Sequence, residues 1–204
     1  TTGTLNTLIG GLAGDAITTA SATTAIGQGA LSACTTASNN VAVGQDSLYT
    51  LTTGTGNAVL GTAAARGMTT GNYNVVVGQD SLKANTTADN NTAVGFQAGY
   101  YTTTGYDNTA TGYAALYSNT DGFRNVANGH GALYSNTTGD YNTASGRSSL
   151  YANTTGGDNT AFGNNALESN TTASYNTAVG KNSLKANTTA SNNTAVGYQA
   201  MTAN

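Results

Sequence analysis

The chain has 204 residues and a formal net charge of −3, and it contains no proline. Only 29 residues are Leu, Ile, Val or Phe, while Thr, Gly and Asn dominate, so a conventional globular core is excluded. The low charge argues against a disordered chain and against a nucleic-acid-binding surface, and no apolar run approaches the ~18 residues that span a membrane.

Glycine recurs every seventeen residues from Gly10 to Gly197 without one insertion. Twelve units of seventeen fill the chain, each approximating T-T-[G/A]-x-x-N-T-A-V-G-x-x-[A/S]-L-x-x-N, as in 171–187. A fixed short period is typical of a repeat architecture, and seventeen residues are too few for two helices. We therefore expect one array over 1–204, an all-β parallel β-solenoid of twelve 17-residue coils stacked at ~4.8 Å.

The positions of each unit are numbered 1 to 17 from its first Thr. Positions 6–9 predict a short strand, Asn91–Val94 in the sixth coil, with Thr92 and Val94 on one face and Ala93 on the other. The glycine at position 10 indicates a corner with positive φ or a close backbone approach. A second strand is predicted over positions 13–15, as at 115–117, and N-T-T-G then turns the chain back. Stacked Asn side chains are expected to form amide ladders that hold a coil with little hydrocarbon.

The Val, Ile and Thr side chains of the first strand cannot fit inside a thin coil that already holds Ala and Ser. We expect this face to meet other chains, and a homotrimer about one axis is the simplest closed arrangement. The alternative is a monomeric solenoid whose wider lumen takes these side chains. Position 9 is polar in three successive coils, at Thr111, Asn128 and Ser145. On a trimer axis these residues would form a polar layer able to hold water or an ion, and the alternative is drift in a tolerant array.

Aromatic residues share one column in four consecutive coils, at Tyr100, Tyr117, Tyr134 and Tyr151. Two interpretations stay open. Exposed rings can stack on the sugar rings of a cell-surface glycan, or they can stack on one another as a cross-strand ladder that stabilises the array.

Position 17 is apolar in the first four coils and mostly Asn afterwards. Its apolar members are Ile17, Cys34, Leu51 and Met68. We expect this edge to pack against another chain or an upstream element, with a filled interior corner as the alternative. The last unit is close to the consensus and does not resemble a cap, so we expect the array to continue past Asn204 or to dock end to end as a filament.

Little in the sequence points to catalysis. His130 is the only histidine, and Asp46 and Asp80 share a column but lie two coils apart. We therefore predict no enzyme, and no catalytic, cofactor or metal site.

The repeated units, best developed at 86–99 and 171–204 with N-T-A-V-G-Y-Q-A at 193–200, carry a family likeness. They resemble the head repeats of trimeric autotransporter adhesins and similar repeats in phage tail-fibre proteins. The resemblance implies a parallel β-roll, three chains about one axis and an extracellular role in attachment. We favour the shaft of a phage tail fibre on the virion surface, which mediates adhesion to a host. The alternatives are a bacterial surface adhesin or extracellular filament and, ranked below them, an ice-binding solenoid with Thr columns at positions 1 and 2.

Overall fold

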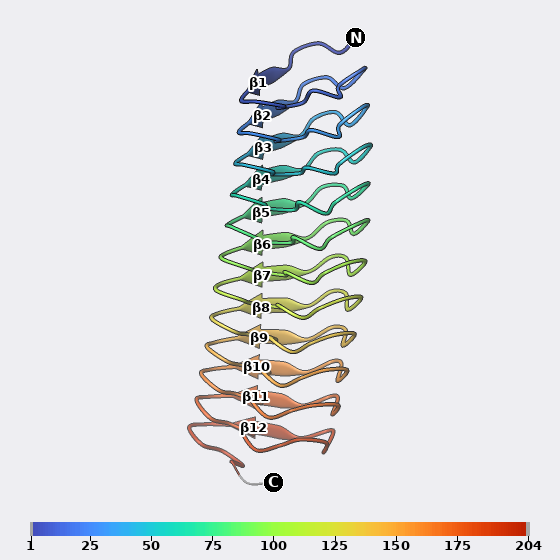
Figure 1. The fold of residues 1–204 in the computed structure, drawn as a ribbon. Helices are drawn as coiled ribbons and strands as arrows, with labels where there is room; N and C mark the ends of the chain where they lie inside the picture. Colours follow the sequence, from blue (N-terminus) through green and yellow to red (C-terminus); the bar gives the residue numbers. More distant parts are fainter. Residues whose placement is uncertain (1, 203–204) are drawn as a thin grey trace.

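A computed structural model of the chain describes residues 2–202 and shows a parallel β-solenoid, as predicted (Figure 1). Each unit contributes one three-residue strand, and the twelve strands pair in chain order in a single parallel sheet. The strands are β1 (Thr7–Ile9), β2 (Thr24–Ile26), β3 (Val41–Val43), β4 (Ala58–Leu60), β5 (Val75–Val77), β6 (Thr92–Val94), β7 (Thr109–Thr111), β8 (Val126–Asn128), β9 (Thr143–Ser145), β10 (Thr160–Phe162), β11 (Thr177–Val179) and β12 (Thr194–Val196).

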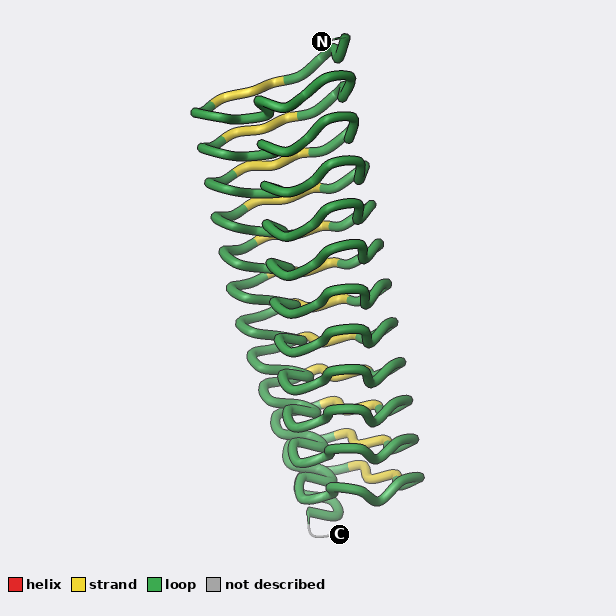
Figure 2. Tube along the Cα trace, turned by 45° about the vertical axis from the view of Figure 1, so that its right-hand side comes forward, coloured by secondary structure: helices red, strands yellow, loops and turns green. Residues whose placement is uncertain are grey.

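Every strand residue pairs with its equivalent seventeen residues later, as Ala93 does with Ala110. The sheet therefore forms one wall of a rod, with the loops on the other side and the two chain ends at opposite tips (Figure 1). The stack twists gradually about its long axis (Figure 2). Thr1, Ala203 and Asn204, which belong to the predicted first and last units, lie outside the described residues.

The strand of the sixth coil begins at Thr92, one residue later than predicted, because Asn91 is held in a side-chain ladder. Ala93 is buried, while Thr92 and Val94 are half-buried on the other face, so the predicted alternation is confirmed. The predicted second strand at 115–117 is wrong, because these residues lie in a turn. Leu116 has a φ of 54°, and the left-handed conformation is incompatible with an extended strand.

The glycine corner has both of the causes that were predicted. Gly112 has a φ of 129°, which disfavours any residue with a side chain. A Cβ at Gly112 would also lie 2.7 Å from the carbonyl carbon and oxygen of Gly129 in the next coil. Successive corners therefore pack backbone on backbone, and this contact explains why the glycine period never slips.

Left-handed backbone conformations recur at positions 5, 12 and 14 of the unit. Within residues 2–202, 31 non-glycine residues have positive φ, whereas only a few per cent of such residues do so in ordinary proteins. Thr, Val and Ile make up about a quarter of the chain yet are absent from all three columns. β-branched side chains are the ones that clash most in this conformation, so local sterics select the residues at these positions.

The interior of the rod is thin and lined by small side chains. Ala at position 8 and Leu at position 14 point inward, as shown by Ala127 and Leu133, which are fully buried. The apolar residues of position 17 are also inside, since Leu51 and Met68 are fully buried. The prediction that this edge packs against another chain or element is therefore wrong, and the residues fill an interior corner. Burial there also raises the pKa of the Cys34 thiol.

Two ladders of buried Asn side chains join successive coils, as predicted. At position 6, the Asn125 Oδ1 accepts a hydrogen bond from the Asn142 backbone N–H at 3.0 Å, and its Nδ2 donates to the Gly139 carbonyl at 2.8 Å. At position 17, the Asn153 Nδ2 donates to the Asn136 Oδ1 at 2.8 Å and to the Gly156 carbonyl at 2.9 Å. Each amide thus satisfies polar groups of the backbone that would be costly to bury unpaired.

The Thr column at position 1 is used inside the array. The Thr137 Oγ1 donates to the Thr154 carbonyl at 3.0 Å, and the same bond links Thr154 to Thr171. These hydroxyls are engaged with the next coil, so positions 1 and 2 do not present two free Thr columns side by side. This geometry counts against the ice-binding alternative.

We predict that Asn142→Ala destabilises the chain by about 1–3 kcal/mol, the usual cost of a buried group without a partner. The substitution leaves the Asn159 backbone N–H, which donates to the Asn142 Oδ1 at 3.1 Å, without its acceptor. Urea denaturation followed by circular dichroism measures the change, with Thr155→Ala, at an exposed position outside the strands, as the matched control. Equal midpoints for the two variants would contradict a stabilising role for the ladder.

Candidate functional site

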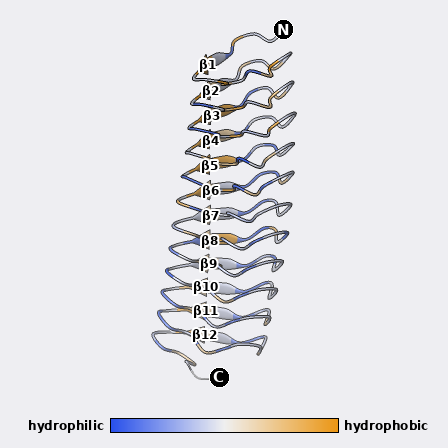
Figure 3. Ribbon diagram, viewed as in Figure 1, coloured by the Kyte–Doolittle hydropathy of each residue, from blue (hydrophilic) through white to orange (hydrophobic). Residues whose placement is uncertain are grey.

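The outer strand face, formed by positions 7 and 9 of every coil, carries most of the exposed aliphatic side chains of the described residues. Exposed side chains on it include Val75 (43%), Val77 (36%) and Phe162 (60%). Since the Ala or Val at position 8 occupies the interior, the alternative in which position 9 fills a wider lumen is wrong. The strands β2 to β5 are coloured more hydrophobic than β9 to β12 (Figure 3). A stripe of this length is the kind of surface that proteins cover with a partner.

The polar residues predicted for a layer at position 9 stand in consecutive rungs of this face. Thr111 pairs with Asn128, and Asn128 pairs with Ser145. Asn128 is exposed, and the other two are half-buried. Apolar residues of the same column, Val94 and Phe162, flank the three polar rungs. The structure therefore brings these residues together and points them outward, and a binding role for them stays a prediction that depends on a neighbouring chain.

Asn128→Val tests the polar layer. At an exposed site the exchange changes stability by no more than about 0.5 kcal/mol, whereas in a layer between chains the added apolar area raises the melting temperature. We expect a higher melting temperature by differential scanning calorimetry and loss of any bound ion. Gln45→Val, at an exposed position off this face, is the control and should leave the melting temperature unchanged. An unchanged melting temperature for Asn128→Val would contradict a polar layer between chains.

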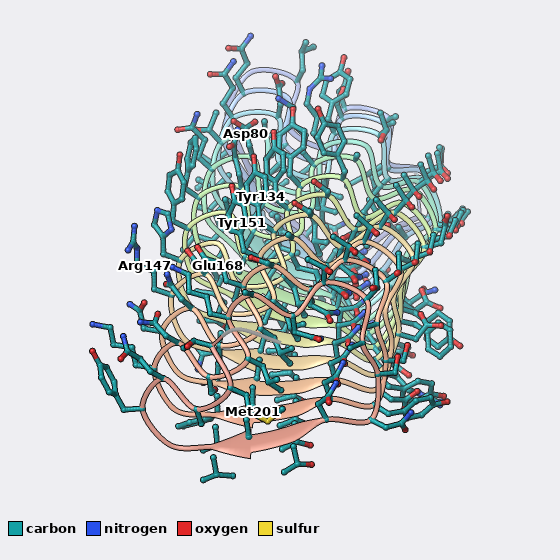
Figure 4. All side chains as sticks on the ribbon, turned by 90° about the horizontal axis from the view of Figure 1, so that it is seen from below. Asp80, Tyr134, Arg147, Tyr151, Glu168 and Met201 are labelled. Atoms are coloured by element: carbon teal, nitrogen blue, oxygen red, sulfur yellow. The ribbon has the colours of Figure 1, made fainter. Side chains whose placement is uncertain are left out.

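The tyrosine column at position 15 forms a ladder of stacked rings. Ring centroids lie 5.3 Å apart for Tyr100 and Tyr117, 5.0 Å for Tyr117 and Tyr134, and 4.9 Å for Tyr134 and Tyr151. Lys83 lies over the outer face of Tyr100, with Nζ 5.7 Å from the ring centroid. Viewed along the rod, Tyr134 and Tyr151 lie on one flank together with Asp80, Arg147 and Glu168 (Figure 4).

This geometry favours the ladder interpretation at the centre of the column. Tyr117 and Tyr134 each have a ring on both sides, so neither has a free face on which a sugar can stack. Position 11 carries a second ladder, in which Tyr113 stacks between Phe96 at 5.4 Å and His130 at 4.9 Å. The aromatic columns thus contribute ring contacts along the rod axis, worth roughly 0.5–1.5 kcal/mol each.

The ladder changes the acidity of its inner members. Desolvation by burial, followed by the charges of neighbouring phenols, raises the pKa of Tyr117 and Tyr134 above the ordinary value. Beside the ladder, the hydrogen bond to Asp80 at 2.8 Å raises the pKa of Lys83. Both effects favour the neutral phenol and the charged amine in the folded chain.

We predict alkaline sensitivity that originates in the ladder. A raised phenol pKa in the folded state contributes stability that is complete below the unfolded value of about 10 and is lost as the pH rises through the folded value. Tyr117→Phe combined with Tyr134→Phe keeps the stack and should weaken the fall in melting temperature above about pH 10. Tyr175→Phe, which removes an exposed phenol outside the ladder, is the control. An equal alkaline fall in wild type and double variant would contradict the effect.

A further aromatic cluster at positions 4 and 5 lies before the strand and was not predicted. Tyr106 stacks on Phe123 at 5.0 Å with an interplanar angle of 1°, and Phe123 meets the Tyr141 ring edge to face at 5.3 Å. Arg124 donates to the Tyr141 hydroxyl at 2.8 Å and pairs with Asp107 at 3.5 Å. The signal was legible in the sequence, because Tyr106 and Phe123 occupy the same column of adjacent coils.

Among residues 2–202 no three His, Cys, Asp or Glu side chains come together in a group that could hold a metal ion. His130 is exposed and stacked on Tyr113. The same residues include no helix with the length and hydropathy needed to cross a bilayer.

Comparison with known proteins gives no match, since no protein-family model, no curated protein and no solved structure is significantly similar to this chain.

Proposed function

We propose that the chain forms the repetitive shaft of a homotrimeric extracellular fibre, a phage tail fibre that attaches the virion to a host surface. The observation that supports this proposal is the outer strand face, where apolar residues occupy position 9 from β1 to β6 and from β10 to β12, with the polar rungs of β7 to β9 between them. A monomer with such a stripe in water would leave Val75, Val77 and Phe162 uncovered, so a partner of equal length and the same period is the natural cover.

Three-fold symmetry suits the geometry of this stripe. Positions 7 and 9 are two parallel columns on one face, so each column can meet a different neighbour when three rods pack about an axis along their length. A cyclic trimer keeps the chains parallel and in step, so that equivalent coils meet at the same level. Both flanks of each rod then stay free, as an attachment role requires. A bacterial surface adhesin or extracellular filament built in the same way remains the alternative.

The oligomeric state tests the proposal. Sedimentation equilibrium should give about three times the 20.3 kDa chain mass, and Val75→Asp combined with Val77→Asp should dissociate the trimer, since it buries two charges per chain at the interface. Thr70→Asp adds one negative charge per chain at an exposed site in the same coil, in a column that already holds Asp121, and should leave the mass unchanged. A monomeric wild-type chain at micromolar concentration would contradict the proposal.

A further inference from the structure

A hollow of about 330 Å³ lies between the sixth and seventh coils, on the edge of the rod where the chain turns into β6 and β7. It is open to solvent rather than enclosed. The side chains that line it are Thr87, Asp89, Asn90, Thr104, Tyr106 and Asp107. One aromatic ring surrounded by carboxylates, hydroxyls and an amide is a distinctive combination for a binding surface.

Tyr106 offers the hollow a free ring face. Phe123 covers the face toward the eighth coil, with the two rings parallel at 5.0 Å. In the sixth coil the same column holds Asp89, which is too short to cover the other face, and the Tyr106 side chain remains 40% exposed. Tyr106 thus differs from Tyr117 and Tyr134, whose rings are stacked on both sides.

The two carboxylates are held in place and keep acceptor capacity. The Asp89 Oδ1 accepts from the Asn72 backbone N–H at 2.7 Å and from its side-chain amide at 3.1 Å. Asp107 pairs through Oδ2 with Arg124, which leans away to the Tyr141 hydroxyl. Within residues 2–202 the Asp89 Oδ2 and the Asp107 Oδ1 make no hydrogen bond, so each is left to accept one from a ligand.

These groups match the chemistry of a neutral sugar. The C–H face of a pyranose ring packs on an aromatic face, and its hydroxyls donate charge-assisted hydrogen bonds to carboxylates. The Thr87 hydroxyl and the Asn90 amide add donors and acceptors at the rim. Two carboxylates in one hollow disfavour an anionic sugar by like-charge repulsion.

We propose that this hollow binds one neutral pyranose unit of a surface glycan, with Tyr106 as the stacking platform and Asp89 and Asp107 as the hydroxyl acceptors. The site gives the attachment function its ligand class and to that extent rests on the proposed function. A trimer would present three copies of this hollow, and multivalent contact strengthens weak individual binding.

Saturation-transfer difference NMR on the whole chain tests the site directly. The probes are the methyl glycosides of glucose, galactose, mannose and N-acetylglucosamine, with the methyl glycoside of glucuronic acid, whose carboxylate is free, as the anionic comparison. We expect a signal from at least one neutral glycoside and at least tenfold weaker binding of the glucuronate. Tyr106→Ser and Asp89→Asn should each weaken the neutral glycoside at least tenfold, and Tyr106→Phe should retain it, because the ring is kept.

The control is Tyr175→Ser, which removes another exposed tyrosine far from the hollow and should leave binding unchanged. The melting temperatures of all variants show whether each of them folds. If Tyr106→Ser does not fold, the conservative Asp89→Asn still tests the site. No signal from any neutral glycoside, a signal that survives Tyr106→Ser, or loss in Tyr117→Ser instead would overturn the proposal. The NMR experiment does not require a trimer. A failure of the sugar site in NMR can therefore be distinguished from a failure of the proposed trimer, which sedimentation would show as a monomeric mass.

Discussion

The contact between equivalent backbone segments of successive coils is the constraint on which this structure depends. Gly112 lies so close to Gly129 that no Cβ fits between them. The strands that lead into these two glycines, β7 and β8, pair residue for residue. Because the period never varies, each side chain meets its own equivalent above and below. The same rule stacks amides on amides, hydroxyls on carbonyls and rings on rings, so one geometric repeat accounts for all three kinds of ladder.

Amide hydrogen bonds take the place that hydrocarbon holds in most protein interiors. A buried Asn is costly unless its polar groups are paired. In this rod both ends of the Asn125 side chain are paired with the next coil, and the Asn153 Nδ2 donates to Asn136 in the previous coil and to the Gly156 carbonyl in the next. Position 17 shows that the two chemistries are interchangeable at one corner, since Met68 fills it in the fourth coil and Asn136 in the eighth. The backbone path is therefore set by the stacked corners, and the filling of the interior can vary.

A fixed interior leaves the outward columns free to differ from coil to coil. The outer strand face stays mostly apolar, whereas aromatic rings gather between 86 and 153 on both edges of the rod. The proposed interface and the proposed sugar site lie on different columns of the same coils, so association through one surface leaves the other accessible. Different faces of the rod can take different roles because the rod has many equivalent outward positions and only one buried layer.

The sequence by itself determined the solenoid, the glycine corner, the inward Ala of each strand and the Asn ladders, because a strict period places identical groups at strand spacing. It misplaced the strand at 115–117, although the absence of β-branched residues from position 14 was a legible sign of left-handed backbone. Only the tertiary structure decided that Leu51 and Met68 point inward and that Tyr106 keeps one bare ring face. A period tells which residues share a column, but the direction of a column depends on the turns between strands, and the exposure of a ring depends on the size of its neighbour in the next coil.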